Sequence, residues 1–201
     1  MPRIIRRAEW GALQPASRTF LDPKQLKGVC VHWFGVPSAA RSHAGCDDLL
    51  RGVQRAHMNH PTEGYVDIAY GHAFCPHGVK YELRGFGVRV GANGTTYANS
   101  NYGAIVYIAG TGDPLTPAAK QAARELIQAY RARGAGRDVK PHGFFTGSGC
   151  PGPQVTAWIR GGGHERNPLR RAVKKATAVV KRPKPTTAGP AACHPTDGRH
   201  P

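Results

Sequence analysis

The sequence predicts an α/β domain with a central β-sheet, because apolar strand-like runs alternate with helical segments along the chain. Residues 29–34 (VCVHWF) form a β-branched and aromatic run between two glycines, which is typical of a buried strand. Residues 104–109 (AIVYIA) form a second run of this kind. Residues 116–133 have the apolar spacing of a helix that packs one face against a core. Together these segments indicate a sheet covered by helices.

The other elements follow in chain order. A helix is expected from about Asp47 to His57, because acidic residues favour a first helical turn and apolar residues follow at helical spacing. Residues 68–74 and 79–83 are expected to be strands joined by the turn CPHG. The main helix can be capped by Thr116 and ended by Gly134. Residues 141–152 are expected to be a loop and 154–160 a short helix.

The charge of the chain is strongly basic and unevenly distributed. The 201 residues carry a formal net charge of +16, and residues 163–201 contribute nine basic against two acidic groups. This last segment is also rich in proline and has almost no large apolar residues after Val180. We therefore expect one domain at 1–162 and a basic, flexible, largely disordered tail at 163–201. The charge implies an anionic partner: nucleic acid, a membrane surface or a cell-wall polymer.

Targeting signals and cysteine usage narrow the class further. No segment reaches the 18 apolar residues of a membrane span, and residues 1–14 lack the apolar core of a signal peptide. The expected location is therefore the cytosol, unless another route of export exists.

Five irregularly spaced cysteines without a CxxC pair argue against a disulfide scaffold or a zinc ribbon. Any metal site has to be assembled from distant positions.

Three residues form a candidate metal-binding set. His32 interrupts an apolar strand, where an unpaired imidazole is costly to bury. His142 and Cys150 stand eight positions apart in the glycine-rich segment HGFFTGSGCPG. Two nitrogens and one thiolate suit tetrahedral zinc with a fourth position open for water, whose pKa zinc can lower to about 7. Spacing alone leaves ordinary surface or core histidines as the alternative.

Several segments occur together in the order found in a known family: RAEWGA, VHWF, VQRAHM, GYVDIAY, GVKYELRG and HGFFTGSGCPG. With them, roughly residues 3–160 resemble the zinc amidases that include phage endolysins of the N-acetylmuramoyl-L-alanine amidase type and the peptidoglycan recognition proteins. The CPHG turn and the stretch PLTPAAK are most similar to endolysins of phages that infect actinobacteria. The resemblance implies a mixed β-sheet flanked by helices.

The resemblance also implies roles for single residues. His32, His142 and Cys150 match the zinc ligands, and Tyr70 matches a tyrosine that faces the scissile carbonyl and can donate to its oxyanion. Ser148 stands where relatives usually have lysine or threonine, and its hydroxyl is expected to assist. Contacts to the substrate are expected from three residues: Trp33, Asn93 (where many relatives have histidine) and Arg84. For Glu82 and Arg84, a structural ion pair remains an alternative.

The other histidines and cysteines are given no catalytic role. His57 is expected to pack at its helix end, and loop or surface positions are expected for His43, His60, His72 and His77. Cys75 and His77 resemble a metal pair, but a Pro-Gly turn explains them better. A disulfide between Cys46 and Cys75 is left open, although a cytosolic origin disfavours it.

The function expected from the resemblance is hydrolysis of the amide between N-acetylmuramic acid and L-alanine in peptidoglycan, with Zn²⁺ as cofactor. The alternative is a peptidoglycan-binding module that does not cut; non-catalytic relatives usually lack the cysteine that is present here as Cys150. Nucleic acid is rejected as a partner, because the basic residues form no recognised motif. The expected protein is a monomeric endolysin that stays in the host cytoplasm until lysis and then reaches the cell wall. Its basic tail would bind anionic wall polymers.

Overall fold

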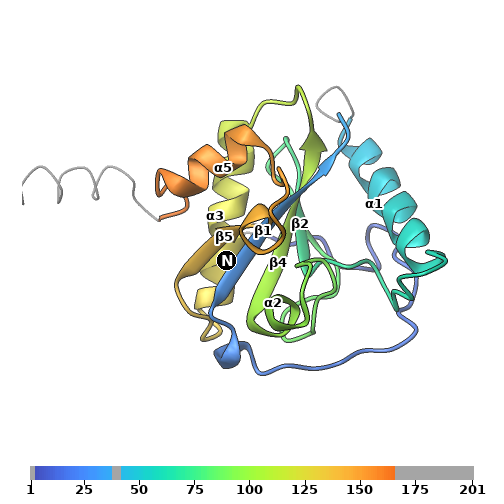
Figure 1. Cartoon of the computed structure of the whole chain (residues 1–201). Coiled ribbons are helices and arrows are strands. Elements are labelled where there is room, and N and C mark those ends of the chain that lie inside the picture. Colours follow the sequence, from blue (N-terminus) through green and yellow to red (C-terminus); the bar gives the residue numbers. More distant parts are fainter. Residues whose placement is uncertain (1–2, 38–41, 166–201) are drawn as a thin grey trace, which may run out of the picture. The chain divides into compact units, whose positions relative to one another are not determined.

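The computed structural model describes residues 3–37 and 42–165 (Figure 1). Within these ranges five strands form one sheet in the order β3-β2-β4-β1-β5. The strands are β1 (Gly28–Gly35), β2 (His72–Phe74), β3 (Lys80–Glu82), β4 (Tyr102–Gly110) and β5 (Asp138–Pro141). All neighbours are parallel except β2 and β3, which are antiparallel. The predicted α/β class and the mixed sheet are therefore confirmed.

Helices cover both faces of this sheet. Helix α1 (His43–Met58) lies on one side in Figure 1, and α3 (Pro117–Arg131) and α5 (Pro153–Arg160) lie on the other. Shorter helical pieces are η1 (Pro23–Gln25), α2 (Thr96–Asn101) and α4 (Gly143–Thr146). No helix in the described ranges combines the length and apolarity needed to cross a membrane.

Strand alternation divides the core into two clusters, because successive side chains point to opposite faces. Val29, Val31 and Trp33 of β1 pack with α3 and α5, in a cluster that also contains Leu126 and Ile159. The opposite face packs beneath α1; the buried members of that cluster include Trp10, Cys46, Leu50, Ala73, Cys75, Tyr81, Val106 and Ile108. Each strand of the sheet centre is therefore buried on both faces.

The main helix is confirmed, whereas two predicted strands are shorter than expected. Thr116 caps α3 by accepting a hydrogen bond from the Ala119 N–H, as its sequence indicated. The strand predicted at 68–74 begins only at His72. Upstream of it, the Ile68 carbonyl accepts from Arg84 Nε and the Ala69 N–H donates to His57 Nδ1. The side chains of Arg84 and His57 thus make the backbone hydrogen bonds that a neighbouring strand would make. A strand-like sequence pattern does not reveal such a substitution.

Four elements were not predicted: η1, α2, β5 and α4. Strand β5 and helix α4 lie in and next to the stretch 141–152 that was expected to be loop, and α2 precedes β4. Their sequences are short and rich in glycine or polar residues, so they lack a periodic apolar signal. The predicted tail at 163–201 falls, from residue 166 onward, outside the described residues.

Candidate metal centre

His32 is held in the middle of the sheet. Strand β1 lies between β4 and β5, and His32 pairs in register with Val106. The side chain is only 2% exposed. Burial lowers the pKa of His32 to about 3, and the neighbouring His142 adds to this effect. The imidazole is therefore neutral at physiological pH, which is the form that binds a metal.

His142 is brought to His32 by the parallel pairing of β1 and β5. It follows directly after β5, and its N–H donates to the Val31 carbonyl over 3.1 Å. The two imidazole rings lie with centroids 4.5 Å apart. His142 Nε2 is buried and has no hydrogen-bond partner among the described residues. An unpartnered buried nitrogen of this kind calls for a ligand, because leaving it unsatisfied is costly.

Glycines shape the loop that returns the chain to Cys150. The Gly143 N–H donates to the Cys150 carbonyl over 2.8 Å. A Cβ at Gly143 would overlap the Ser148 carbonyl oxygen, so only glycine fits there. Gly147 ends α4 with a positive φ of 72°, which glycine adopts without strain. The eight-residue interval between His142 and Cys150 is thus a compact turn fixed by its backbone.

The three side chains together fit a zinc ion. One ligand atom from each of His32, His142 and Cys150 lies within 4.8 Å of the other two. Burial raises the pKa of the Cys150 thiol and lowers the pKa of His142, so without metal both are uncharged at neutral pH. Zinc prefers imidazole and thiolate ligands, and three protein ligands leave a fourth position open. Binding would release the thiol proton.

Asn93 lies behind His32. It is fully buried, and its Oδ1 is 2.9 Å from His32 Nε2. Its amide group donates to the carbonyls of Ala98 and Tyr102. This fixes Oδ1 as the acceptor and Nε2 as the protonated nitrogen of His32, so Nδ1 is left to bind a metal. Asn93 was expected to line the substrate groove. In the structure it instead supports His32, the first candidate ligand.

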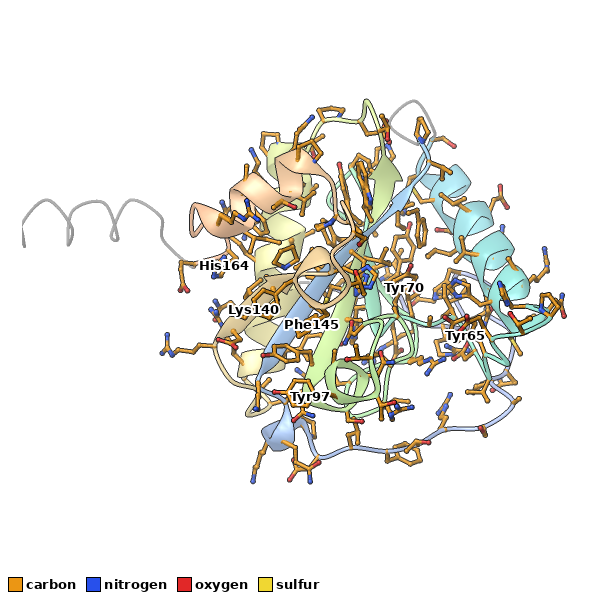
Figure 2. All side chains as sticks on the ribbon, viewed as in Figure 1. Tyr65, Tyr70, Tyr97, Lys140, Phe145 and His164 are labelled. Atoms are coloured by element: carbon orange, nitrogen blue, oxygen red, sulfur yellow. The ribbon has the colours of Figure 1, made fainter. Side chains whose placement is uncertain are left out.

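Tyr70 faces the metal centre from the side of α1. Its ring packs edge-on against His32 with centroids 5.2 Å apart, and it also contacts Phe34 and His57. Figure 2 shows it near the middle of the view, between the sheet and α1. Burial raises the pKa of Tyr70, and the nearby Cys150 adds to this effect. Its hydroxyl is therefore a hydrogen-bond donor throughout the physiological range.

Ser148 is exposed at the other side of the centre. Its hydroxyl lies 2.9 Å from the hydroxyl of Thr146, a residue that the sequence analysis did not single out. A Cβ at Gly94 would meet both the Thr146 methyl group and His142 Nε2, which places Thr146 next to the second histidine. The spacing of four between His142 and Thr146, one turn of α4, is the signal that could have identified it.

The side chain of Trp33, which was expected to contact the substrate, does not lie beside that of His32. Trp33 points to the face of β1 opposite His32 and packs its ring on Gly152 and the α3 side of the core. Strand alternation is the reason, since neighbours on a strand cannot share a face. Trp33 therefore lies on the opposite face of β1 from His32, and its contact with a substrate remains a prediction.

Arg84 mainly organises backbone. Its guanidinium donates to three carbonyls, those of Asp67, Ile68 and Arg89. Glu82 pairs with Arg6 at 3.5 Å, so the alternative of an ion pair with Arg84 is wrong. Arg84 also borders a polar cavity of about 340 Å³, which Arg18, Glu63 and Tyr65 line as well. Contact between Arg84 and a substrate remains a prediction.

Two further histidines were interpreted from sequence. His57 packs at the end of α1 and accepts from the Ala69 N–H over 3.0 Å, as expected. His72 was expected in a loop or at the surface, but it is fully buried in β2 beside Tyr130. The strand predicted at 68–74 already included His72, but a polar residue suggests a solvent-facing position, whereas β2 is buried on both faces.

Comparison with known proteins identifies the fold. The sequence matches no protein-family model and no curated protein. Among solved structures, Drosophila PGRP-LB is 25% identical with a TM-score of 0.68, over 78% of this chain and 92% of that one. Drosophila PGRP-SD (23% identity, TM-score 0.69) is matched over 79% of this chain and 93% of its own. Human PGRP-IβC, solved with a glycosamyl muramyl pentapeptide, is 24% identical with a TM-score of 0.67, over 79% and 95%. The chain therefore has the fold of the peptidoglycan recognition proteins.

Proposed function

We propose that this chain is a zinc-dependent amidase that cuts the bond between N-acetylmuramic acid and L-alanine in bacterial peptidoglycan. The observation that carries the proposal is the convergence of His32, His142 and Cys150 on one point, where His142 also has a buried nitrogen without a hydrogen-bond partner among the described residues. The fold supports the substrate class, since human PGRP-IβC is solved with a muramyl pentapeptide. When bound, zinc supplies a nucleophile at neutral pH and polarises the scissile carbonyl.

The residues of the chain supply positioning and charge stabilisation. Asn93 holds the tautomer and orientation of His32 through its 2.9 Å contact. The Tyr70 hydroxyl donates to the oxyanion that forms as water adds to the carbonyl carbon. The C–N bond then breaks, and the amino group of L-alanine leaves with a proton. The hydroxyl pair Thr146 and Ser148 is the candidate for assisting this step from the opposite side.

The test is product analysis on purified actinobacterial cell walls. An amidase exposes new L-alanine amino groups without producing new reducing sugar ends, which mass analysis of the products distinguishes. His142→Ala should lose zinc and activity, whereas Tyr70→Phe should keep zinc and lose about 100-fold in kcat. His60→Ala removes an exposed histidine away from the centre and serves as the matched control. Full activity of His142→Ala would refute the mechanism.

A binding module without activity is the second candidate. The polar cavity bordered by Arg84 and Tyr65 favours it, because such a groove can hold a glycopeptide whether or not a bond is cut. The two functions differ in one measurement. A binding module sediments with cell walls and releases no L-alanine amino groups from them, even when the chain holds one equivalent of zinc at His32, His142 and Cys150.

We further propose that the enzyme acts as a phage endolysin, in the host cytoplasm until lysis and at the wall afterwards. The resemblance of the CPHG turn and the PLTPAAK stretch to endolysins of actinobacterial phages supports this role. Expression in an actinobacterial host should leave cells intact until a holin is co-expressed. Lysis without a holin would contradict this role while leaving the amidase proposal untouched.

A further inference from the structure

Four side chains outside the centre described above converge on a second point. They are His43, Cys46, Cys75 and His77, and one ligand atom from each lies within 4.8 Å of the other three. His43 and Cys46 lie one turn apart at the start of α1. Cys75 and His77 lie in the turn between β2 and β3. Two short pairs, HxxC and CxH, are thus brought together from two separate elements.

The two sulfurs are inside the protein and the two imidazoles close the cluster from the surface. Cys46 and Cys75 are fully buried, whereas His43 and His77 are exposed. Cys46 Sγ lies 3.7 Å from His77 Nδ1, so the pair from α1 and the pair from the turn are already in contact. Neither cysteine is in a disulfide in the structure.

The surroundings orient the exposed histidine of α1. His43 Nδ1 lies 3.1 Å from the Tyr81 hydroxyl. The Tyr81 hydroxyl can accept a hydrogen bond from a protonated His43 Nδ1, which leaves Nε2 of His43 for a metal. A metal-binding histidine typically makes such a bond with its other nitrogen.

The turn that carries Cys75 and His77 is rigid. The Gly78 N–H donates to the Cys75 carbonyl over 3.0 Å, and Gly78 has a positive φ of 85°. The Thr116 hydroxyl donates to the Pro76 carbonyl over 2.6 Å. A Cβ at Gly78 would press against Ala118 of α3 at 3.0 Å. The turn is thus fixed from both sides, as a preformed half of a metal site requires.

We propose that His43, Cys46, Cys75 and His77 form a second, structural zinc site of the Cys₂His₂ type. Thiolate and imidazole are the ligands that zinc favours, and four protein ligands leave no open position for water. The site differs in this respect from the His32 centre, which has three. Its function is to clamp the start of α1 to the β2–β3 turn. A disulfide between Cys46 and Cys75 is the competing use of the two thiols and would leave both histidines without a role.

Zinc content of the full chain, purified under reducing conditions and measured by elemental analysis, tests the site. The wild type should hold two equivalents, Cys150→Ala one, Cys75→Ser one and the double variant none. His43→Ala/His77→Ala keeps both buried thiols, so it tests the site even if Cys75→Ser does not fold; it should also hold one. His60→Ala, a single exposed histidine elsewhere, should hold two. Two equivalents retained by the His43/His77 variant would overturn the proposal.

Cobalt and thiol measurements separate this site from the His32 centre and from a disulfide. In Cys150→Ala, added Co²⁺ should give thiolate-to-metal charge-transfer absorption that disappears on adding Cys75→Ser. Absence of this absorption in reduced Cys150→Ala would overturn the proposal. So would three titratable thiols, instead of the five in the sequence, in protein denatured without reductant. The cobalt result in Cys150→Ala and the thiol count do not depend on the His32 centre, so the two proposals fail independently.

Discussion

Asn93 illustrates how one residue controls another at the metal centre. Its three side-chain hydrogen bonds involve His32 and two backbone carbonyls, and it is fully buried. The sequence indicated that this position matters, but assigned it to the substrate. Only the folded chain shows that it lies behind the histidine, because residues 32 and 93 are adjacent only through the packing of β1 against the segment before α2.

Replacing Asn93 by alanine should weaken zinc binding at the His32 centre. The imidazole loses the acceptor that fixes its tautomer, so the affinity should fall about 10–100-fold. Competition with a chelator of known affinity measures the change. Asn101→Ala, which removes a single bond to the Tyr97 carbonyl within α2, is the control and should bind zinc like the wild type. Equal zinc affinity for Asn93→Ala would show that the contact with His32 has no influence on the metal.

At the scale of elements, close approaches between strands and helices depend on residues without side chains. Gly103 of β4 has Tyr130 of α3 directly above it, and an added Cβ would overlap the tyrosine ring. The helix α1 also contains a glycine, Gly52, which is exposed and has open space around its Cα. The sequence predicted both elements, although α1 begins at His43 and not at about Asp47. It does not reveal which glycine is in contact with another element.

These two glycines should respond to alanine in opposite directions. Gly103→Ala should lower the free energy of unfolding by about 1–3 kcal/mol, since Tyr130 is buried and has little freedom to move. Gly52→Ala should raise it by about 0.5–1 kcal/mol, because alanine loses less backbone entropy in a helix. Urea denaturation monitored by circular dichroism measures both. Equal changes in the free energy of unfolding for the two variants would mean that Tyr130 moves away from an added methyl group at position 103 without cost.

At the scale of the whole molecule, a buried histidine links folding to pH. His72 is fully buried, and burial lowers its pKa to about 3, with a smaller contribution from Arg133. The unfolded chain takes up this proton near the ordinary value of 6.5. The unfolded state therefore binds more protons between these values, and the free energy of unfolding falls as the pH drops through this range.

The contribution of His72 should amount to about 2 kcal/mol between pH 7 and pH 5. Glutamine cannot take up a proton. Over this interval the free energy of unfolding of the wild type should therefore fall by about 2 kcal/mol more than that of His72→Gln. The difference between the two proteins isolates His72, because both keep the same metal ligands. Urea denaturation at each pH provides the measurement. Parallel stability curves would show that His72 is protonated in the folded state as easily as in the unfolded chain.

The charge of the chain also acts at this scale. Residues 166–201 contain nine basic residues and one acidic residue, and we propose that they bind anionic wall polymers. Deleting them should weaken sedimentation with cell walls at low salt, and the difference should vanish at high salt because ions screen the attraction. A neutral Gly/Ser tail of equal length is the control and should behave like the deletion. Unchanged binding at every salt concentration would exclude a role for this charge.

The α/β class and the main helix with its Thr116 cap could be predicted from local sequence, and the resemblance to the zinc amidases implied the candidate ligands His32, His142 and Cys150. The class and the helix depend on local signals, namely apolar period and capping chemistry, which are present in neighbouring residues. Tertiary structure alone decided that Trp33 faces away from His32, that Asn93 supports it, and that His43 and His77 join Cys46 and Cys75. Such relations depend on strand alternation and on contacts between distant segments. The clearest example is the turn CPHG. Its local sequence explains the turn itself, but only the packing of α1 places His43 and Cys46 beside Cys75 and His77.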